Sequence, residues 1–195
     1  MTDITNLSTV NVAISNYIAV VTMNNPPVNA QNRQFHDDLT LAFDVLSDRN
    51  DVRSIVLTGA GKCFSAGADI KGRASQESNL GDHWVHSRRV RECFYSIMEC
   101  RKPVIAAING AALGAGLAVA ASADILIASE SASVGLPEIN VGLLGGGRHA
   151  MRLFGHSKTR RLMLTGQRLS GAELYRLGAV EECVPDDDLM RAALE

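Results

Sequence analysis

Two buried apolar segments of this chain are each followed by a glycine-rich turn and then by a helical pattern. The segment Arg53–Thr58 precedes the turn Phe64–Ile70, and the segment Val104–Ile108 precedes the turn Ala112–Gly116. Short apolar runs bounded by turn residues are typical of buried strands. Because such strands alternate here with helices, the pattern predicts an α/β protein.

The same alternation continues along most of the chain. Apolar runs predict strands, helical spacing of apolar residues predicts amphipathic helices, and a capping box followed by a glycine bounds a short helix. The polar stretch Lys71–Asp82 is expected to be a loop. The other expected strands are Tyr17–Met23 and Asp124–Ala128, and the expected helices are Asn32–Ser47, a segment from Val90 up to Pro103, and one that Ser170 opens and Gly178 closes.

Composition and charge exclude several classes of protein. The chain has 195 residues, of which 46% are hydrophobic, and its net charge of −2 leaves no basic surplus for a nucleic-acid partner. None of the four cysteines forms a CxxC pair, so a zinc ribbon and a thioredoxin-like motif are excluded. The N-terminus carries no secretory signal pattern, and a cytoplasmic protein with reduced thiols is expected.

One uncharged segment has the length of a membrane span. Val104–Ala123 contains no charged residue, but Ala and Gly dominate it and Asn109-Gly110 interrupts it after a short β-branched start. A buried strand followed by a helix of small residues accounts for this composition better. No membrane partner is therefore expected.

Common nucleotide and metal motifs fail when they are tested by position. Gly61-Lys62 lacks the P-loop glycine five residues earlier, where Val56 stands, and Cys63 follows in place of Ser or Thr. Residues 114–119 start like a dinucleotide fingerprint but end in Val119. His83 and His86 have no third ligand nearby, so no metal site is expected.

The two glycine-rich turns themselves are candidates for a site. Turns that lead from a strand into a helix expose backbone N–H groups where the helix dipole favours negative charge. Two such turns brought together can stabilise an oxyanion. The alternative is that both are tight turns in a crowded core, where only Gly and Ala fit. Spacing alone leaves both interpretations open.

Longer motifs carry a resemblance to a known family. The sequence is similar to the crotonase (enoyl-CoA hydratase/isomerase) superfamily over nearly its whole length and in the family's order. The matching segments are Ile55–Lys71 for the first signature, Lys102–Gly116 for the second, Gly135–Glu138 with Gly142 onward for the third, and Leu164–Gly166 with Gly178–Val180 for the later part.

The resemblance implies a fold and an assembly. The family fold is a spiral of ββα units, so a single crotonase-like core domain is expected over residues 1–195. Helices that mediate trimer contacts follow in the family, and this C-terminal helical part, beyond residue 185, is expected to be largely absent from the chain. A homotrimer or a dimer of trimers is the implied assembly.

The resemblance also implies a site for an acyl-CoA substrate. The backbone N–H groups of Ala68 and Ala115 would form the oxyanion hole for a thioester enolate, and Glu138 would be the catalytic residue. Coenzyme A is part of the substrate, so no separate cofactor and no metal are expected. The remaining substrate-binding residues would be Ala66, Gly67, Asp69, Ile70, Lys71, Gly114 and Pro137.

One departure from the family pattern bears on the reaction. Hydratases of the family use two glutamates, and Ala118 occupies the position of the first. A single carboxylate can still take a proton from one carbon and return it to another, so double-bond isomerisation of an enoyl-CoA in fatty acid metabolism is favoured. The alternatives are a hydratase with a second group outside the motifs and a non-catalytic acyl-CoA-binding protein.

Overall fold

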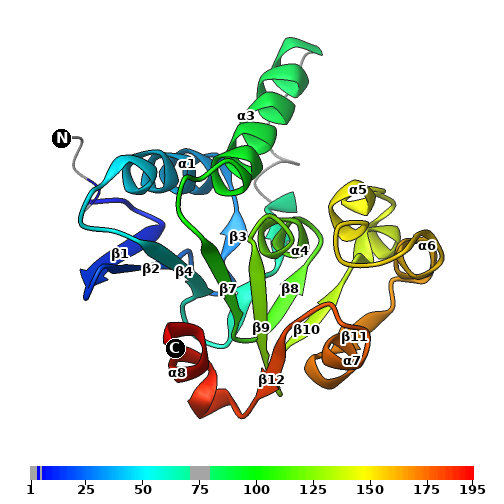
Figure 1. Ribbon diagram of the computed structural model, residues 1–195. Helices are drawn as coiled ribbons and strands as arrows, with labels where there is room; N and C mark the ends of the chain where they lie inside the picture. Colours follow the sequence, from blue (N-terminus) through cyan, green and yellow to red (C-terminus); the bar gives the residue numbers. More distant parts are fainter. Residues whose placement is uncertain (1–3, 5, 71–79) are drawn as a thin grey trace.

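The computed structural model describes residue 4, residues 6–70 and residues 80–195 (Figure 1). Its largest sheet has six strands in the order β1-β2-β4-β7-β9-β12, and all neighbours except the β1–β2 pair are parallel. These strands are β1 Val10–Ser15, β2 Ile18–Met23, β4 Ser54–Gly59, β7 Val104–Ile108, β9 Ile125–Ser129 and β12 Glu182–Val184.

Two smaller sheets lie beside the large one. A four-stranded sheet has the order β11-β10-β8-β5, and a two-stranded sheet pairs β3 with β6. Their strands are β3 Ala30–Gln31, β5 Cys63–Ser65, β6 Gly67–Ala68, β8 Ala111–Leu113, β10 Ser133–Gly135 and β11 Arg168–Ser170.

Helices cover the sheets, and the long α3 extends past the rest of the molecule (Figure 1). They are α1 Arg33–Asp48, α3 Leu80–Met98, α4 Ala115–Ala120, α5 Gly147–Ala150, α6 His156–Thr165, α7 Gly171–Arg176 and α8 Leu189–Leu194, with 3-10 turns η1 Pro137–Val141 and η2 Asp186–Asp188. In the described ranges no helix is both long and apolar enough to cross a membrane.

The chain repeats one structural unit. In each repeat a strand enters the six-stranded sheet, the next strand enters the four-stranded sheet, and a helix follows: β4, β5 and α3, then β7, β8 and α4, then β9, β10 and α5. The parallel pairing of β5 with β8 and of β8 with β10 stacks the units in sequence. The predicted ββα spiral is confirmed by this topology.

Side chains on the central strands alternate between two apolar clusters. Ile55 and Leu57 of β4 face the main core, whereas Val56 faces a smaller cluster that Leu189 and Ala193 of α8 complete. This period of two is the geometry of a strand buried on both faces. It explains why β4, β7 and β9 appear in the sequence as continuous apolar runs.

The first strand was not predicted from the sequence. β1 pairs with β2 through a tight hairpin in which Asn16 and Tyr17 have φ of 50° and 64°. Two consecutive residues with positive φ are the requirement of the hairpin turn that matches strand twist. The alternation of Val10, Val12 and Ile14 with smaller or polar residues was the available sequence signal.

Several predicted bounds are wrong. The expected turn Phe64–Ile70 contains the end of β5 and all of β6, and the expected turn Ala112–Gly116 contains the end of β8 and the start of α4. The helix expected up to Pro103 ends earlier, at Met98; Pro103 disfavours helical backbone only at Lys102, directly before it. The loop expected through Asp82 gives way to α3 at Leu80, and Asp82 lies in the first turn, where the helix dipole favours a carboxylate. Residues 71–79 of that expected loop lie outside the described residues.

Candidate active site

The two glycine-rich turns predicted from the sequence lie against each other. A Cβ added to Gly67 would be 2.5 Å from the Leu113 carbonyl oxygen and 3.2 Å from the Ala115 nitrogen. Gly67 also has φ of 93°, which residues with a side chain rarely adopt. Both the close approach and the backbone conformation therefore require glycine at position 67. The close approach also places β6 next to the start of α4.

The backbone of β6 determines the direction of the Ala68 N–H group. The Asp69 N–H donates to the Gln31 carbonyl oxygen on β3 at 3.1 Å, and Gln31 is the register partner of Ala68. Successive N–H groups of a strand point to opposite edges. The Ala68 N–H therefore points away from β3, and Ala68 itself is exposed.

The Ala115 N–H group lies at the first position of α4. Gly114 is the N-cap, with φ of 56° and ψ of −117°, and no side chain caps this end. The first N–H groups of a helix have no partner within the helix. The Ala115 N–H is consequently available to an anionic group at the helix N-terminus.

Glu138 lies beside that helix start. It is the second residue of η1, which begins at Pro137, and its backbone carbonyl accepts a hydrogen bond from the Leu143 N–H at 2.9 Å. A Cβ added to Gly114 would be only 2.6 Å from the Glu138 Oε1 atom, and one added to Gly146 would be 3.9 Å from it. The carboxylate therefore occupies a space that the missing side chain of Gly114 leaves open.

The environment of Glu138 suits proton transfer. Its Oε2 atom is buried without a hydrogen-bond partner in the described part of the chain. Burial raises the pKa of this half-buried carboxyl, because the low-polarity surroundings disfavour its charged form. A carboxyl whose pKa rises toward the working pH is a better general acid and base.

Ala118 belongs to the apolar core. It is 1% exposed and lies on α4 among buried apolar side chains of the main cluster. Its carbonyl oxygen accepts hydrogen bonds from the Ser122 hydroxyl at 2.8 Å. No acid–base group therefore stands at this position.

The other predicted substrate-binding residues are distributed around the two turns. Ala66 is exposed and its N–H donates to the Val28 carbonyl oxygen at 3.0 Å. Asp69 is partly buried, and Ile70 is exposed. Lys71 lies outside the described residues. Pro137 and Gly114, by contrast, directly adjoin the Glu138 carboxylate in sequence or in space.

A hydrogen-bond network beneath the first turn was not anticipated from the sequence. Ser65, Gln31 and Asn29 are all buried and are linked by side-chain hydrogen bonds between β5 and β3. Among the described residues, the buried side-chain atoms without a partner are Gln31 Oε1, His36 Nδ1 and Nε2, and Glu138 Oε2.

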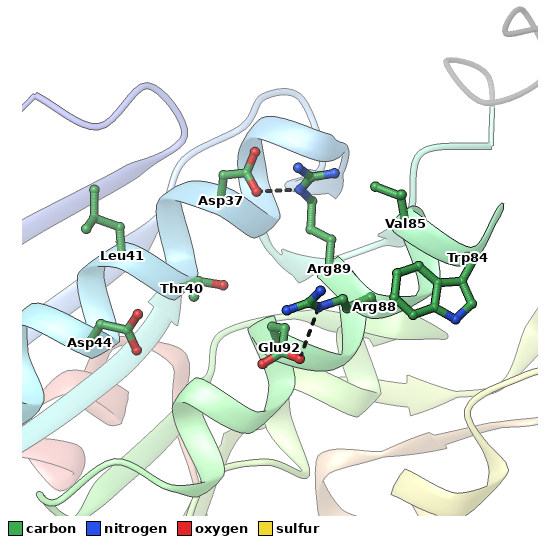
Figure 2. A pocket seen from close by; sticks show the side chains of 9 residues that line it. All are labelled: Asp37, Thr40, Leu41, Asp44, Trp84, Val85, Arg88, Arg89 and Glu92. Atoms are coloured by element: carbon green, nitrogen blue, oxygen red, sulfur yellow. Dashed lines mark hydrogen bonds and ion pairs between the residues drawn. The ribbon is translucent and has the colours of Figure 1, made fainter. Parts of the chain in front are cut away.

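A separate hollow of about 430 Å³ lies between α1 and α3 (Figure 2). Four of its charged side chains form ion pairs: Arg89 Nε lies 2.5 Å from Asp37 Oδ1, and Arg88 Nε lies 3.9 Å from Glu92 Oε1. None of the predicted site residues lines it. In the described ranges no group of three His, Cys, Asp or Glu side chains could hold a metal ion.

Comparison with known proteins gives consistent results. The sequence matches the enoyl-CoA hydratase/isomerase family over residues 13–195. A probable enoyl-CoA hydratase of Bacillus subtilis is 38% identical over 184 residues, which are 93% of this chain and 71% of the relative. A Mycobacterium tuberculosis protein named (7aS)-7a-methyl-1,5-dioxo-2,3,5,6,7,7a-hexahydro-1H-indene-carboxyl-CoA hydrolase is 37% identical over 179 residues, covering 91% of this chain and 71% of its own.

A solved structure extends the agreement to three dimensions. The enoyl-CoA hydratase from Bacillus anthracis matches with a TM-score of 0.88 at 31% identity, over 96% of this chain and 74% of that one. This match confirms the crotonase-like fold predicted from the motifs. On sequence and fold together, the chain belongs to the enoyl-CoA hydratase/isomerase (crotonase) superfamily, whose members act on acyl-CoA thioesters.

Proposed function

We propose that this protein isomerises the double bond of an enoyl-CoA thioester. The Glu138 carboxylate would take a proton from C2 of a 3-enoyl thioester and return it to C4, leaving the 2-enoyl product with unchanged mass. The negative charge that develops on the thioester oxygen would be held by the Ala68 and Ala115 N–H groups. The observation that carries this proposal is the partly desolvated Glu138 carboxylate beside the α4 N-terminus.

The two N–H groups support the enolate assignment. Contact of Gly67 with the Leu113 and Ala115 backbone brings the two turns together, while the strand register points the Ala68 N–H away from β3. Preorganised N–H groups aimed at a developing oxyanion contribute about two to three powers of ten in rate per donor. The first helical position of α4 adds the positive end of its dipole.

The absence of an acid–base group at position 118 supports isomerisation over hydration. Adding water requires one group to deprotonate the water and a proton source for the α-carbon, which paired carboxylates provide. The Ala118 methyl group is buried and can do neither. One carboxylate that shuttles a proton is sufficient for isomerisation.

Hydration is the second candidate, and the names of the relatives favour it. The Bacillus subtilis relative is named a probable enoyl-CoA hydratase, and the solved Bacillus anthracis structure is an enoyl-CoA hydratase. A hydratase would need a second group outside the family motifs.

A panel of acyl-CoA thioesters separates these reactions. Incubation with 3-hexenoyl-CoA and crotonyl-CoA, followed by mass spectrometry and ultraviolet absorbance, distinguishes three results: unchanged mass with a new conjugated thioester, gain of water, or loss of CoA. Isomerisation predicts the first result with 3-hexenoyl-CoA. Binding of all thioesters with no turnover would instead identify an acyl-CoA-binding protein.

Glu138→Gln tests the catalytic residue. Glutamine keeps the shape of the side chain and loses its basicity, so turnover should fall by about two to four powers of ten while thioester binding stays nearly intact. Glu182→Gln is the matched control, because Glu182 is an exposed residue of the edge strand β12. Full activity in Glu138→Gln would remove this residue from the mechanism.

A further inference from the structure

We propose that Ser65 is a positioning residue that sets the separation of the two oxyanion donors. The inference rests on the proposed assignment of the Ala68 and Ala115 N–H groups. Ser65 is completely buried at the end of β5, two residues before β6 begins with Gly67. It lies within the first turn, where its hydroxyl contacts Gly67, and its backbone contacts Gly116 of the second turn.

The Ser65 hydroxyl uses all of its hydrogen-bonding capacity. Its oxygen donates its one hydrogen to the Asn29 carbonyl oxygen at 2.7 Å. The same oxygen accepts from the Gln31 side-chain amide at 3.2 Å and from the Gly67 N–H at 3.3 Å. A hydroxyl offers one donor and two acceptor positions, so the set is complete. The last of these bonds fixes the peptide next to the Ala68 donor.

The Ser65 backbone holds the second turn. The α4 residue Gly116 lies so close to the Ser65 carbonyl that a Cβ there could not be accommodated without displacing the Ser65 backbone. Gly116 follows Ala115 directly. Ser65 therefore contacts one neighbour of each donor: Gly67 before Ala68, and Gly116 after Ala115.

Asn29 anchors the network to the rest of the turn. Its side-chain amide nitrogen donates to the carbonyl oxygens of Ala60, Cys63 and Phe64 at 3.1, 2.7 and 3.3 Å. It is 2% exposed and has φ of 52°, a conformation that asparagine tolerates better than most residues. The carbonyl that accepts from Ser65 is thus held in place by interactions with the strand that carries Ser65.

The hydrogen bonds of the Ser65 hydroxyl also determine the orientation of the Gln31 side-chain amide. Because the hydroxyl hydrogen of Ser65 is used by Asn29, Gln31 must present its NH₂ group to Ser65. Its Oε1 atom is then left buried without a partner in the described part of the chain. Gln31 is also the register partner of Ala68. An unpaired buried oxygen is retained here at a cost, which fits a residue that is needed to hold the donor strand.

Ser65→Ala tests the proposal with two readouts. The probe is butyryl-CoA labelled with ¹³C at the thioester carbonyl; its bound carbonyl stretching band reports hydrogen bonding to the oxygen and needs no turnover. In Ser65→Ala the band should return toward its position in free solution. With 3-hexenoyl-CoA, kcat should fall about tenfold to a hundredfold, with KM within about twofold, because misplaced donors act on the transition state.

Ser129→Ala is the matched control for a general loss of packing. Ser129 is a buried serine of β9 with a hydroxyl 3.1 Å from that of Ser131, and Gly171 lies against its carbonyl oxygen much as Gly116 lies against that of Ser65. Ser129→Ala should leave both the band and kcat unchanged. Equal losses in the two variants would overturn the positioning role.

The outcomes separate this inference from the proposed function. If 3-hexenoyl-CoA is not turned over but the carbonyl band is displaced in the unmodified protein and restored by Ser65→Ala, isomerisation fails and the positioning role stands. A band that Ser65→Ala leaves displaced, or that is never displaced, overturns the role. If Ser65→Ala does not fold, the Gln31→Met variant is measured in its place. In Gln31→Met the carbonyl band should shift part of the way back toward its position in free solution. A band that stays where it is in the unmodified protein would reject the proposal.

Discussion

The Glu138 carboxylate lies against the backbone of Gly114, so closely that a Cβ at Gly114 would be 2.6 Å from Oε1. Gly114 also has φ of 56°, so a side chain there would be strained even without the carboxylate. The residue before the proposed donor at Ala115 thus also sets the position of the proposed proton carrier.

Gly114→Ala should therefore reduce both stability and turnover. The strained backbone is expected to cost about 1–3 kcal/mol of unfolding free energy, and displacement of Glu138 should lower kcat at least about tenfold. Gly178→Ala is the control, since Gly178 has φ of 67° but nothing within 4 Å of its added Cβ. It should lose about 1 kcal/mol and keep its kcat. Equal kcat values for the two variants would contradict the role of this contact.

Turnover should depend on pH through Glu138. The carboxylate must be ionised to take the first proton, and burial raises its pKa above the ordinary value for glutamate. The rate should therefore fall on the acid side at a pH above 4.5 and reach a plateau at higher pH. A profile of kcat/KM from pH 4 to pH 8 checks this, with circular dichroism to confirm folding at each pH. A rate that stays flat to pH 4 would exclude Glu138 as the base.

Glu138→Gln should raise the melting temperature at pH 7. A carboxyl whose pKa is higher in the folded than in the unfolded protein opposes folding once the pH exceeds the unfolded pKa. Glutamine removes that opposition, so the gain should vanish below about pH 4, where the carboxyl is protonated in both states. Thermal unfolding at both pH values measures the effect; a lower melting temperature at pH 7 would contradict it.

Ala118→Glu should destabilise the protein strongly. The position is 1% exposed within the apolar core, and an uncompensated buried charge costs about 3–5 kcal/mol. In the fraction that folds, hydration of crotonyl-CoA should exceed that of the unmodified protein. The Ala118→Gln variant has a side chain of the same volume without the charge, and it should hydrate crotonyl-CoA no faster than the unmodified protein. Hydration by the unmodified protein above about 100 per second would show that a second acid–base group exists elsewhere.

His36 should make folding sensitive to acid. It is 2% exposed, and both ring nitrogens lack a hydrogen-bond partner in the described part of the chain. Burial first, and then the positive field of His86, lower its pKa from 6.5 to about 4, although Asp37 opposes this and Arg89 adds to it. Between pH 6.5 and about pH 4, His36 is therefore protonated in the unfolded chain but neutral in the folded protein. Stability is full above pH 6.5 and declines as the pH falls toward 4.

The size of this effect can be measured with one substitution. A shift of this size corresponds to about 3 kcal/mol lost between pH 7 and pH 4. His36→Leu removes no side-chain hydrogen bond and should flatten that dependence, whereas His156→Leu, on an exposed helix start, should not. Urea unfolding at pH 7 and pH 4 makes the comparison. An equally steep decline in His36→Leu would assign the acid sensitivity to other groups.

Local patterns in the sequence were sufficient for the first strand of each repeated unit. Buried runs such as Val104–Ile108 depend on propensity and neighbours, so they predicted strands of the six-stranded sheet and the α/β class, whereas the short strands β5, β8 and β10 of the four-stranded sheet were not predicted. The family motifs then pointed to Ala68, Ala115 and Glu138. β1 was not predicted because its outward-facing residues Asn11, Ala13 and Ser15 interrupt the apolar run, and because its hairpin turn uses Asn16 and Tyr17 rather than glycine.

Only the tertiary structure decided how the site is held. Ser65 meets Asn29 across 36 positions in the sequence, and Gly114 meets Glu138 through the return of a later unit. Such contacts depend on the register of neighbouring strands, which no local pattern specifies. The same holds for His36: its place in the amphipathic helix α1 is local, but its burial without a partner is imposed by the packing of α3. The amino-acid sequence alone thus determined the apolar strands and the candidate site residues, and the stacking of the units determined the distances between those residues and the burial that shifts the pKa of Glu138 and His36.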